Sequence, residues 1–78
     1  MNMEMNEFVQ NFASQFDDTQ ASEFQATTNF REIDEWSSLT ALSIIAMVDE
    51  EYKVKLTGEE IRNSQSIMDI YNIVKSKI

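Results

Sequence analysis

Apolar residues recur at helical spacing in the first part of the chain. Over residues 3–16 they are separated by three, four or one positions, which places them on one stripe of a helix: Met5, Phe8, Val9, Phe12 and Phe16. We therefore predict a first helix over 3–16 with this stripe facing a core. Asp17 and Asp18 follow, and two negative charges are unfavourable at a helix C-terminus, so the helix should end there.

The clearest helical pattern spans residues 38–52. Its expected buried stripe comprises Ala41, Ile44, Ile45, Val48 and Tyr52. Another arc beside Ser38 mixes leucines with acidic residues, which is typical of a protein-docking surface. We call this arc the docking face and define it as Leu39, Leu42, Ala46, Asp49 and Glu50. The alternative is that Leu39 and Leu42 pack against the preceding loop.

Two further helices are indicated by their start signals. Thr57 and Glu60 have the spacing of a capping box and predict a short helix over 58–63. Ser66 and Asp69 form a weaker version of the same pattern before a helix over 67–76. The apolar stripe of this last segment is complete: Ile67, Ile70, Tyr71, Val74 and Ile78.

The segment between the first two helices, residues 17–36, has no sustained period and is rich in polar residues. Its apolar residues are expected to attach it to the bundle, with room for a short helical turn: Phe24, Phe30, Ile33 and Trp36. The sequence therefore predicts an all-α protein, a small four-helix bundle with three longer helices and one short helix. A long loop separates the first two helices, and residues 1–78 form one domain.

Charge is distributed unevenly along a chain whose net charge is −8. Residues 1–52 hold eleven acidic residues and a single basic one, Arg31, whereas residues 53–78 are slightly basic. The basic surface that nucleic-acid binding requires is missing, and protein partners with basic patches are favoured. The longest apolar run, Ile44–Val48, is too short to span a membrane. We expect a cytoplasmic monomer.

The composition excludes most catalytic chemistry. The chain has no histidine and no cysteine, which removes a Ser-His-Asp triad, a thiolate nucleophile and the usual zinc ligands. One glycine, Gly58, cannot build a glycine-rich phosphate loop. Residues 49–60 have the length of a calcium loop, but Lys53 and Val54 stand where an oxygen ligand and a glycine are required. We expect no enzymatic activity and no metal site.

Two serines lie where the second helix begins. Ser37 fits the N-cap position, where its side-chain oxygen would accept a hydrogen bond from the amide of Thr40 or its neighbour. Ser38 would then be the first helical residue, with its hydroxyl free and directed outward. A phosphate on Ser38 would meet unpaired N–H groups and the positive end of the helix dipole. The alternative is that both serines serve only as caps.

These residues resemble the acyl carrier proteins over essentially the whole chain. The resemblance is carried by Trp36-Ser37-Ser38-Leu39, by the apolar helix that ends in Asp49-Glu50-Glu51-Tyr52, and by Val54-Lys55-Leu56 before a short helix. In that family the motif is usually Asp-Ser-Leu, and its serine is esterified by 4′-phosphopantetheine. The matching serine is Ser38, because Leu39 follows it. Ser37 stands where the family usually has aspartate.

The resemblance implies a function as a non-catalytic carrier. A phosphopantetheinyl transferase would donate the arm from coenzyme A to Ser38. The arm would carry acyl groups as thioesters to acyl-transferring and condensing enzymes of fatty acid, polyketide or related lipid biosynthesis. Such partners are expected to meet the docking face with basic patches. The alternatives are a peptidyl or aminoacyl carrier, and a small acidic helical adaptor that carries nothing.

Overall fold

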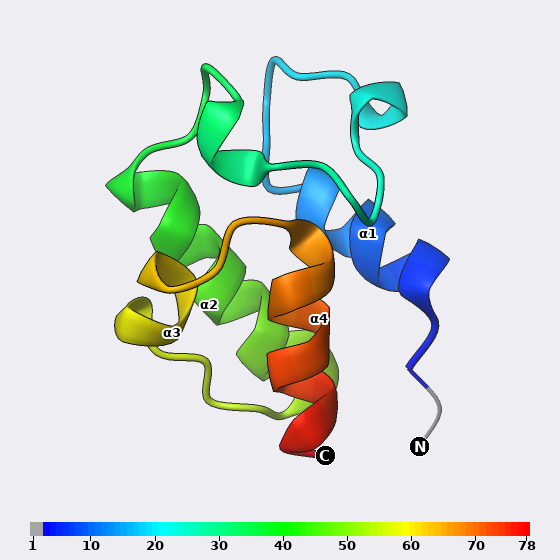
Figure 1. Cartoon of the computed structure of the whole chain (residues 1–78), viewed down its shortest axis with the longest axis vertical. Helices are drawn as coiled ribbons and strands as arrows, with labels where there is room; N and C mark the ends of the chain where they lie inside the picture. The colour runs from blue at the N-terminus through cyan, green and yellow to red at the C-terminus, as the bar shows by residue number, and fades with distance from the viewer. Residues whose placement is uncertain (1–2) are drawn as a thin grey trace.

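The computed structural model describes residues 3–78, so the first two residues of the predicted domain lie outside it. The described chain folds into four α-helices and two 3-10 turns, and it contains no β-strand: α1 (Met5–Ala13), η1 (Ala21–Glu23), η2 (Phe30–Glu32), α2 (Ser38–Tyr52), α3 (Gly58–Arg62) and α4 (Ile67–Ser76). Helices α1, α2 and α4 surround one core, and α3 packs on α2 and α4 (Figure 1). The predicted all-α bundle is confirmed.

Helix α1 is shorter than the predicted span of 3–16, and both of its ends have a physical cause. At the start, Met3 stays outside the helix because its carbonyl oxygen accepts a hydrogen bond from the Tyr71 hydroxyl at 2.6 Å. At the end, the amides of Gln15 and Phe16 bond to the carbonyls three residues earlier, which tightens the last turn. This turn directs Phe16 into the core, where its ring centroid lies 4.8 Å from that of Phe24.

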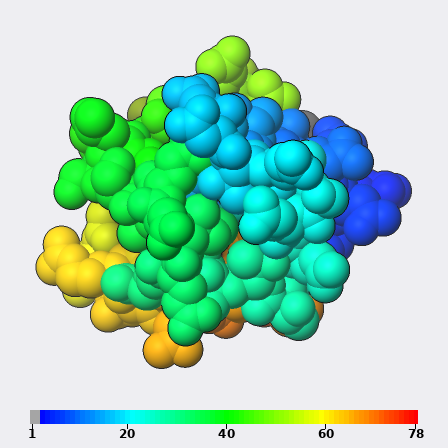
Figure 2. Space-filling view, turned by 90° about the horizontal axis from the view of Figure 1, so that it is seen from above, coloured from blue at the N-terminus to red at the C-terminus, as the bar shows by residue number. Residues whose placement is uncertain are grey.

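Aromatic residues fix the long connection, residues 14–37, to the bundle, as the sequence predicts. Phe24 and Phe30 are buried, and Ile33 and Trp36 are half-buried against the core. The ring centroid of Phe30 lies 4.6 Å from that of Trp36 and 5.6 Å from that of Phe12. Seen from above, this connection covers one end of the bundle (Figure 2). The long loop is therefore attached to the core through these apolar side chains.

The connection also forms backbone hydrogen bonds with the start of α4. The amide of Phe30 donates to the carbonyl of Gln65, and the amides of Ile67 and Met68 donate to carbonyls of residues 28 and 26. Ser66 caps α4 and forms a complete capping box with Asp69, which confirms the weaker sequence pattern. The first N–H groups of α4 are thus satisfied by carbonyls of the connection and by Ser66 itself.

Helix α2 has the predicted bounds, but its buried side is turned relative to the predicted stripe. Ile44, Val48 and Tyr52 are buried as expected, whereas Ala41 and Ile45 are only half-buried. Thr40 and Met47 are buried instead, because α2 packs against α1 as well as α3. In the last helical stripe the prediction fails at Ile78, which follows the end of α4 and is exposed.

The short helix α3 ends one residue before its predicted limit, and Thr57 caps it in a capping box with Glu60. None of the helices within residues 3–78 has the length and apolar character that crossing a membrane requires.

Candidate functional site

The site is built on the first turn of α2, and Ser37 is its N-cap. The amide of Thr40 donates to the Ser37 Oγ over 3.4 Å, which is long for a hydrogen bond. The Thr40 hydroxyl adds a second connection, since it donates to the carbonyl oxygen of Glu35 at 3.1 Å. The cap was predictable, but the buried Thr40 hydroxyl that supports it was not, because threonine at this position also fits an ordinary helical surface.

Ser38 is the first residue of α2, and its side chain is exposed. Within residues 3–78 its hydroxyl forms no hydrogen bond, and neither do the backbone N–H groups of Ser38 and Leu39. These N–H groups belong to the first turn of a helix, where the donors lack helical acceptors and the dipole is positive. The structure therefore presents a free hydroxyl beside free donors.

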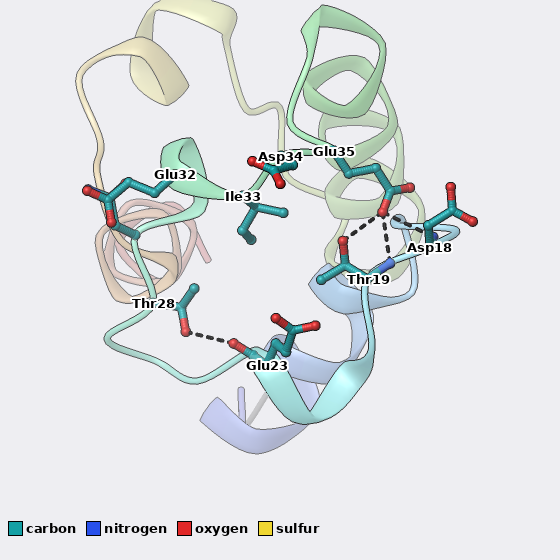
Figure 3. Close-up of a pocket in the computed structure, with 9 residues that line it drawn as sticks. Asp18, Thr19, Glu23, Thr28, Glu32, Ile33, Asp34 and Glu35 are labelled. Carbon is teal, nitrogen blue, oxygen red and sulfur yellow. Dashed lines mark hydrogen bonds between the residues drawn. The ribbon is translucent and has the colours of Figure 1, made fainter.

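Glu35, the residue before Trp36, is held by hydrogen bonds from residues 17–19. The Glu35 carboxylate accepts hydrogen bonds from the amides of Asp18 and Thr19 at 3.0 and 2.9 Å (Figure 3). It accepts another from the amide of Asp17 at 2.6 Å. The Thr19 hydroxyl donates a fourth at 2.8 Å. This hydroxyl and the three amides hold the pKa of Glu35 below its usual value. Sequence reasoning missed this contact, because Asp17 and Asp18 act through their backbone amides.

The docking face is accessible to solvent along most of its length. Leu39 and Leu42 are 76% and 61% exposed, so they do not pack against the connection. Ala46 and Glu50 are exposed as well. Asp49 is half-buried and pairs with Lys55 at 3.2 Å. Two large apolar side chains thus lie on the same exposed side of α2 as Glu50, which is the arrangement expected of a protein-binding surface.

A hollow of about 420 Å³ lies between α2 and α3, next to Ser38. We call it the α2–α3 hollow. Apolar side chains form much of its lining, and serines and arginines complete it together with Gly58: Trp36, Ala41, Leu42, Ile45, Ile61, Ser37, Ser38, Arg31 and Arg62. The sequence prediction missed this hollow because it assigned Ala41 and Ile45 to the core. Their incomplete burial leaves apolar surface beside the free hydroxyl.

The Arg31 side chain links the connection, residues 14–37, to the end of α3 beside this hollow. Its Nε donates to the carbonyl of Ser64 at 2.8 Å, and its Nη2 donates to the carbonyls of Ile61 and Arg62. These carbonyls lie at the C-terminal end of α3, where a cation is favourable. Arg31 therefore fixes one wall of the hollow.

A second hollow, of about 640 Å³, lies in the connection (Figure 3). Its lining includes five carboxylates: Asp18, Glu23, Glu32, Asp34 and Glu35. Glu35 is already bonded as described above, and the Thr28 hydroxyl donates to the carbonyl of Glu23. Across residues 3–78, no three acidic side chains are placed to hold a metal ion together.

Comparison with known proteins adds no assignment: no family model matches the chain, and neither a curated protein nor a solved structure matches it.

Proposed function

We propose that the protein carries acyl groups on a 4′-phosphopantetheine arm attached to Ser38. The observation that carries the proposal is the exposed, unbonded Ser38 hydroxyl at the first position of α2, beside two unpaired backbone N–H groups. A phosphate bound there meets donors and the positive end of the helix dipole. The resemblance of residues 36–39 to the serine motif of acyl carrier proteins supports the same position.

The surroundings of Ser38 fit such an arm. The hydroxyl lies on the rim of the α2–α3 hollow, and the apolar side chains of Ala41, Ile45 and Ile61 line the space next to it. The arm, when attached, supplies the thiol on which an acyl group is carried as a thioester. The chain offers no histidine or cysteine to activate Ser38, so a transferase would remove the hydroxyl proton.

The docking face supports a role in presenting cargo to other proteins. Leu39 and Leu42 would enter an apolar depression of a partner, and Glu50 and Asp49 would meet a basic patch at the far end of α2. The partners that fit are the phosphopantetheinyl transferase and the acyl-transferring and condensing enzymes. The Lys55 side chain already neutralises part of the Asp49 charge, so Glu50 would carry more of the attraction.

The first prediction tests the attachment site. Purified apo-protein is incubated with coenzyme A, magnesium and a broad-specificity phosphopantetheinyl transferase, and its intact mass is measured. We expect a mass increase of one phosphopantetheine in the wild type and in Ser37→Ala, and no increase in Ser38→Ala. The two variants form a matched pair, since each removes one neighbouring exposed hydroxyl. Circular dichroism verifies that both remain helical.

Two results would contradict the proposal in different ways. If Ser38→Ala still gains the arm and Ser37→Ala does not, the attachment site is the capping serine. If the folded wild type gains nothing, the carrier function itself is wrong.

A further inference from the structure

Two arginines face the same hollow in an otherwise acidic molecule. Arg31 and Arg62 both line the α2–α3 hollow, together with Ser38. Lys55 and Lys77 pair with Asp49 and Glu60, but neither arginine forms an ion pair with a carboxylate of residues 3–78. Two positive charges without a carboxylate partner therefore lie on the rim where the free hydroxyl lies.

The two arginines differ in how firmly they are held. Three carbonyls at the end of α3 hold the Arg31 guanidinium, and they leave its positive charge uncompensated by a carboxylate. Arg62 is the last residue of α3 and is exposed, and its side chain forms no hydrogen bond to residues 3–78. Glu59, one turn earlier on α3, does not pair with it either. Arg62 is thus free to bind an anion.

The composition of the hollow indicates what kind of group it accommodates. Its apolar side chains favour an uncharged chain, and its arginines favour a negative charge close to Ser38. The guanidinium fork matches the geometry of phosphate oxygens and bonds them more strongly than it bonds neutral acceptors. A phosphate esterified to Ser38 and continued by a flexible, mostly uncharged chain has both properties.

We propose that Arg62, assisted by the charge of Arg31, binds the phosphate of the arm on Ser38 and directs the arm along the α2–α3 hollow. This inference rests on the proposed function. Arg62 is then a positioning residue: it orients the arm toward α3 and leaves Leu39 of the docking face, which does not line the hollow, free for a partner. The interaction is noncovalent and reversible, so a partner enzyme can draw the arm out.

The experiment compares thermal unfolding of the apo and arm-bearing forms of four proteins: the wild type, Arg62→Gln, Arg62→Lys and Lys53→Gln. Intact mass first establishes that each is modified. The control Lys53→Gln removes the same charge at the opposite end of α2. An exposed ion pair stabilises a domain of this size only modestly, so the arm should raise the wild-type Tm at low salt by a few degrees, at most about 4–8 °C.

We expect Arg62→Gln to lose this rise, Arg62→Lys to keep part of it, and Lys53→Gln to keep all of it. About 1 M NaCl should abolish the wild-type rise, because the screening length is then only about 3 Å. A wild type without the rise, or an equal rise in wild type and Arg62→Gln, overturns the role of Arg62 and leaves the carrier function intact. A wild type that is never modified overturns both.

Discussion

Helices α2 and α4 both begin at a serine, but the two helix starts are built differently. Ser66 forms a closed capping box with Asp69, and the connection supplies acceptors for the next amides of α4. Ser37 accepts one long capping hydrogen bond, and Thr40 stands three residues later, at the position that Asp69 has in α4. The amides of Ser38 and Leu39 have no acceptor within residues 3–78. The start of α4 is saturated, whereas the start of α2 keeps donors available for a ligand.

An open helix start needs support from elsewhere, and α2 receives it from distant residues. The Glu35 carboxylate accepts hydrogen bonds from the segment after α1, and the Glu35 carbonyl accepts one from the Thr40 hydroxyl. The Trp36 ring packs against that of Phe30. Tertiary contacts thus replace the local capping that α4 has. The comparison indicates that the position of Ser38 depends on the long connection more than on the cap.

The largest expected effect comes from Phe30, which touches both helix starts. Its ring packs on Trp36 before α2, and its amide bonds to Gln65 before α4. Phe30→Ala should lower the free energy of unfolding by about 3–5 kcal/mol, because it leaves a cavity where a fully buried ring had been. Urea unfolding is followed by Trp36 fluorescence and by far-ultraviolet circular dichroism.

The two signals should remain coincident in Phe30→Ala, since one core joins both helix starts. The control Ile33→Ala, at a half-buried position of the same connection, should cost less. Fluorescence that changes well before helicity would mean that the connection unfolds on its own, and the start of α2 would then be independent of α4.

Replacing the capping serines should give the next largest loss of stability, and it allows a direct comparison of the two helix starts. Ser66→Ala should cost about 1 kcal/mol of unfolding free energy, the usual value for a lost cap. Ser37→Ala should cost less, because its capping bond is 3.4 Å long and Thr40 remains bonded to Glu35. Equilibrium urea unfolding measures both, with Ser38→Ala as the reference for replacing an uncapped helical serine. A greater loss for Ser37→Ala than for Ser66→Ala would invalidate the comparison.

The same contrast explains how much of the fold was visible in the sequence. The capping patterns at Thr57 and Ser66 are local, so α3 and α4 could be located within a residue from hydroxyl and acid spacing alone. The end of α1 could not, because it depends on Phe16 packing against Phe24 and on a carboxylate far along the chain. Such contacts leave no periodic signal in the segments they join.

The candidate site was visible to a similar extent. Ser37 and Ser38 could be placed by the capping rule, and the exposed arc of α2 followed from helical periodicity. The α2–α3 hollow could not be predicted, because it exists only where α3 leaves Ile45 incompletely covered. The position of Arg31 over the end of α3 is likewise a tertiary contact, between residues some thirty positions apart.

The smallest expected effect concerns the Glu35 carboxylate, because solvent reaches it and weakens its hydrogen bonds. Its pKa is lowered in the folded protein, chiefly by the Thr19 hydroxyl and the amides of residues 17–19, so folding is favoured when it is ionised. The contribution is therefore present above the ordinary pKa of a glutamic acid, about 4.3, and is lost as the pH falls through the lower folded value. Glu35→Gln should lower the Tm at neutral pH.

The pH dependence of the difference between wild type and Glu35→Gln sharpens the test. The gap in Tm should be constant near neutral pH and should shrink as the pH falls below about 4.3, because the wild-type carboxylate then becomes protonated. Asp69 titrates in both proteins and cancels in the difference. Glu32→Gln is the matched control, since Glu32 is exposed in the same connection and its side chain bonds to no residue of 3–78. A gap that is equally large in Glu32→Gln would reflect net charge alone, and α2 would then start without the support of residues 17–19.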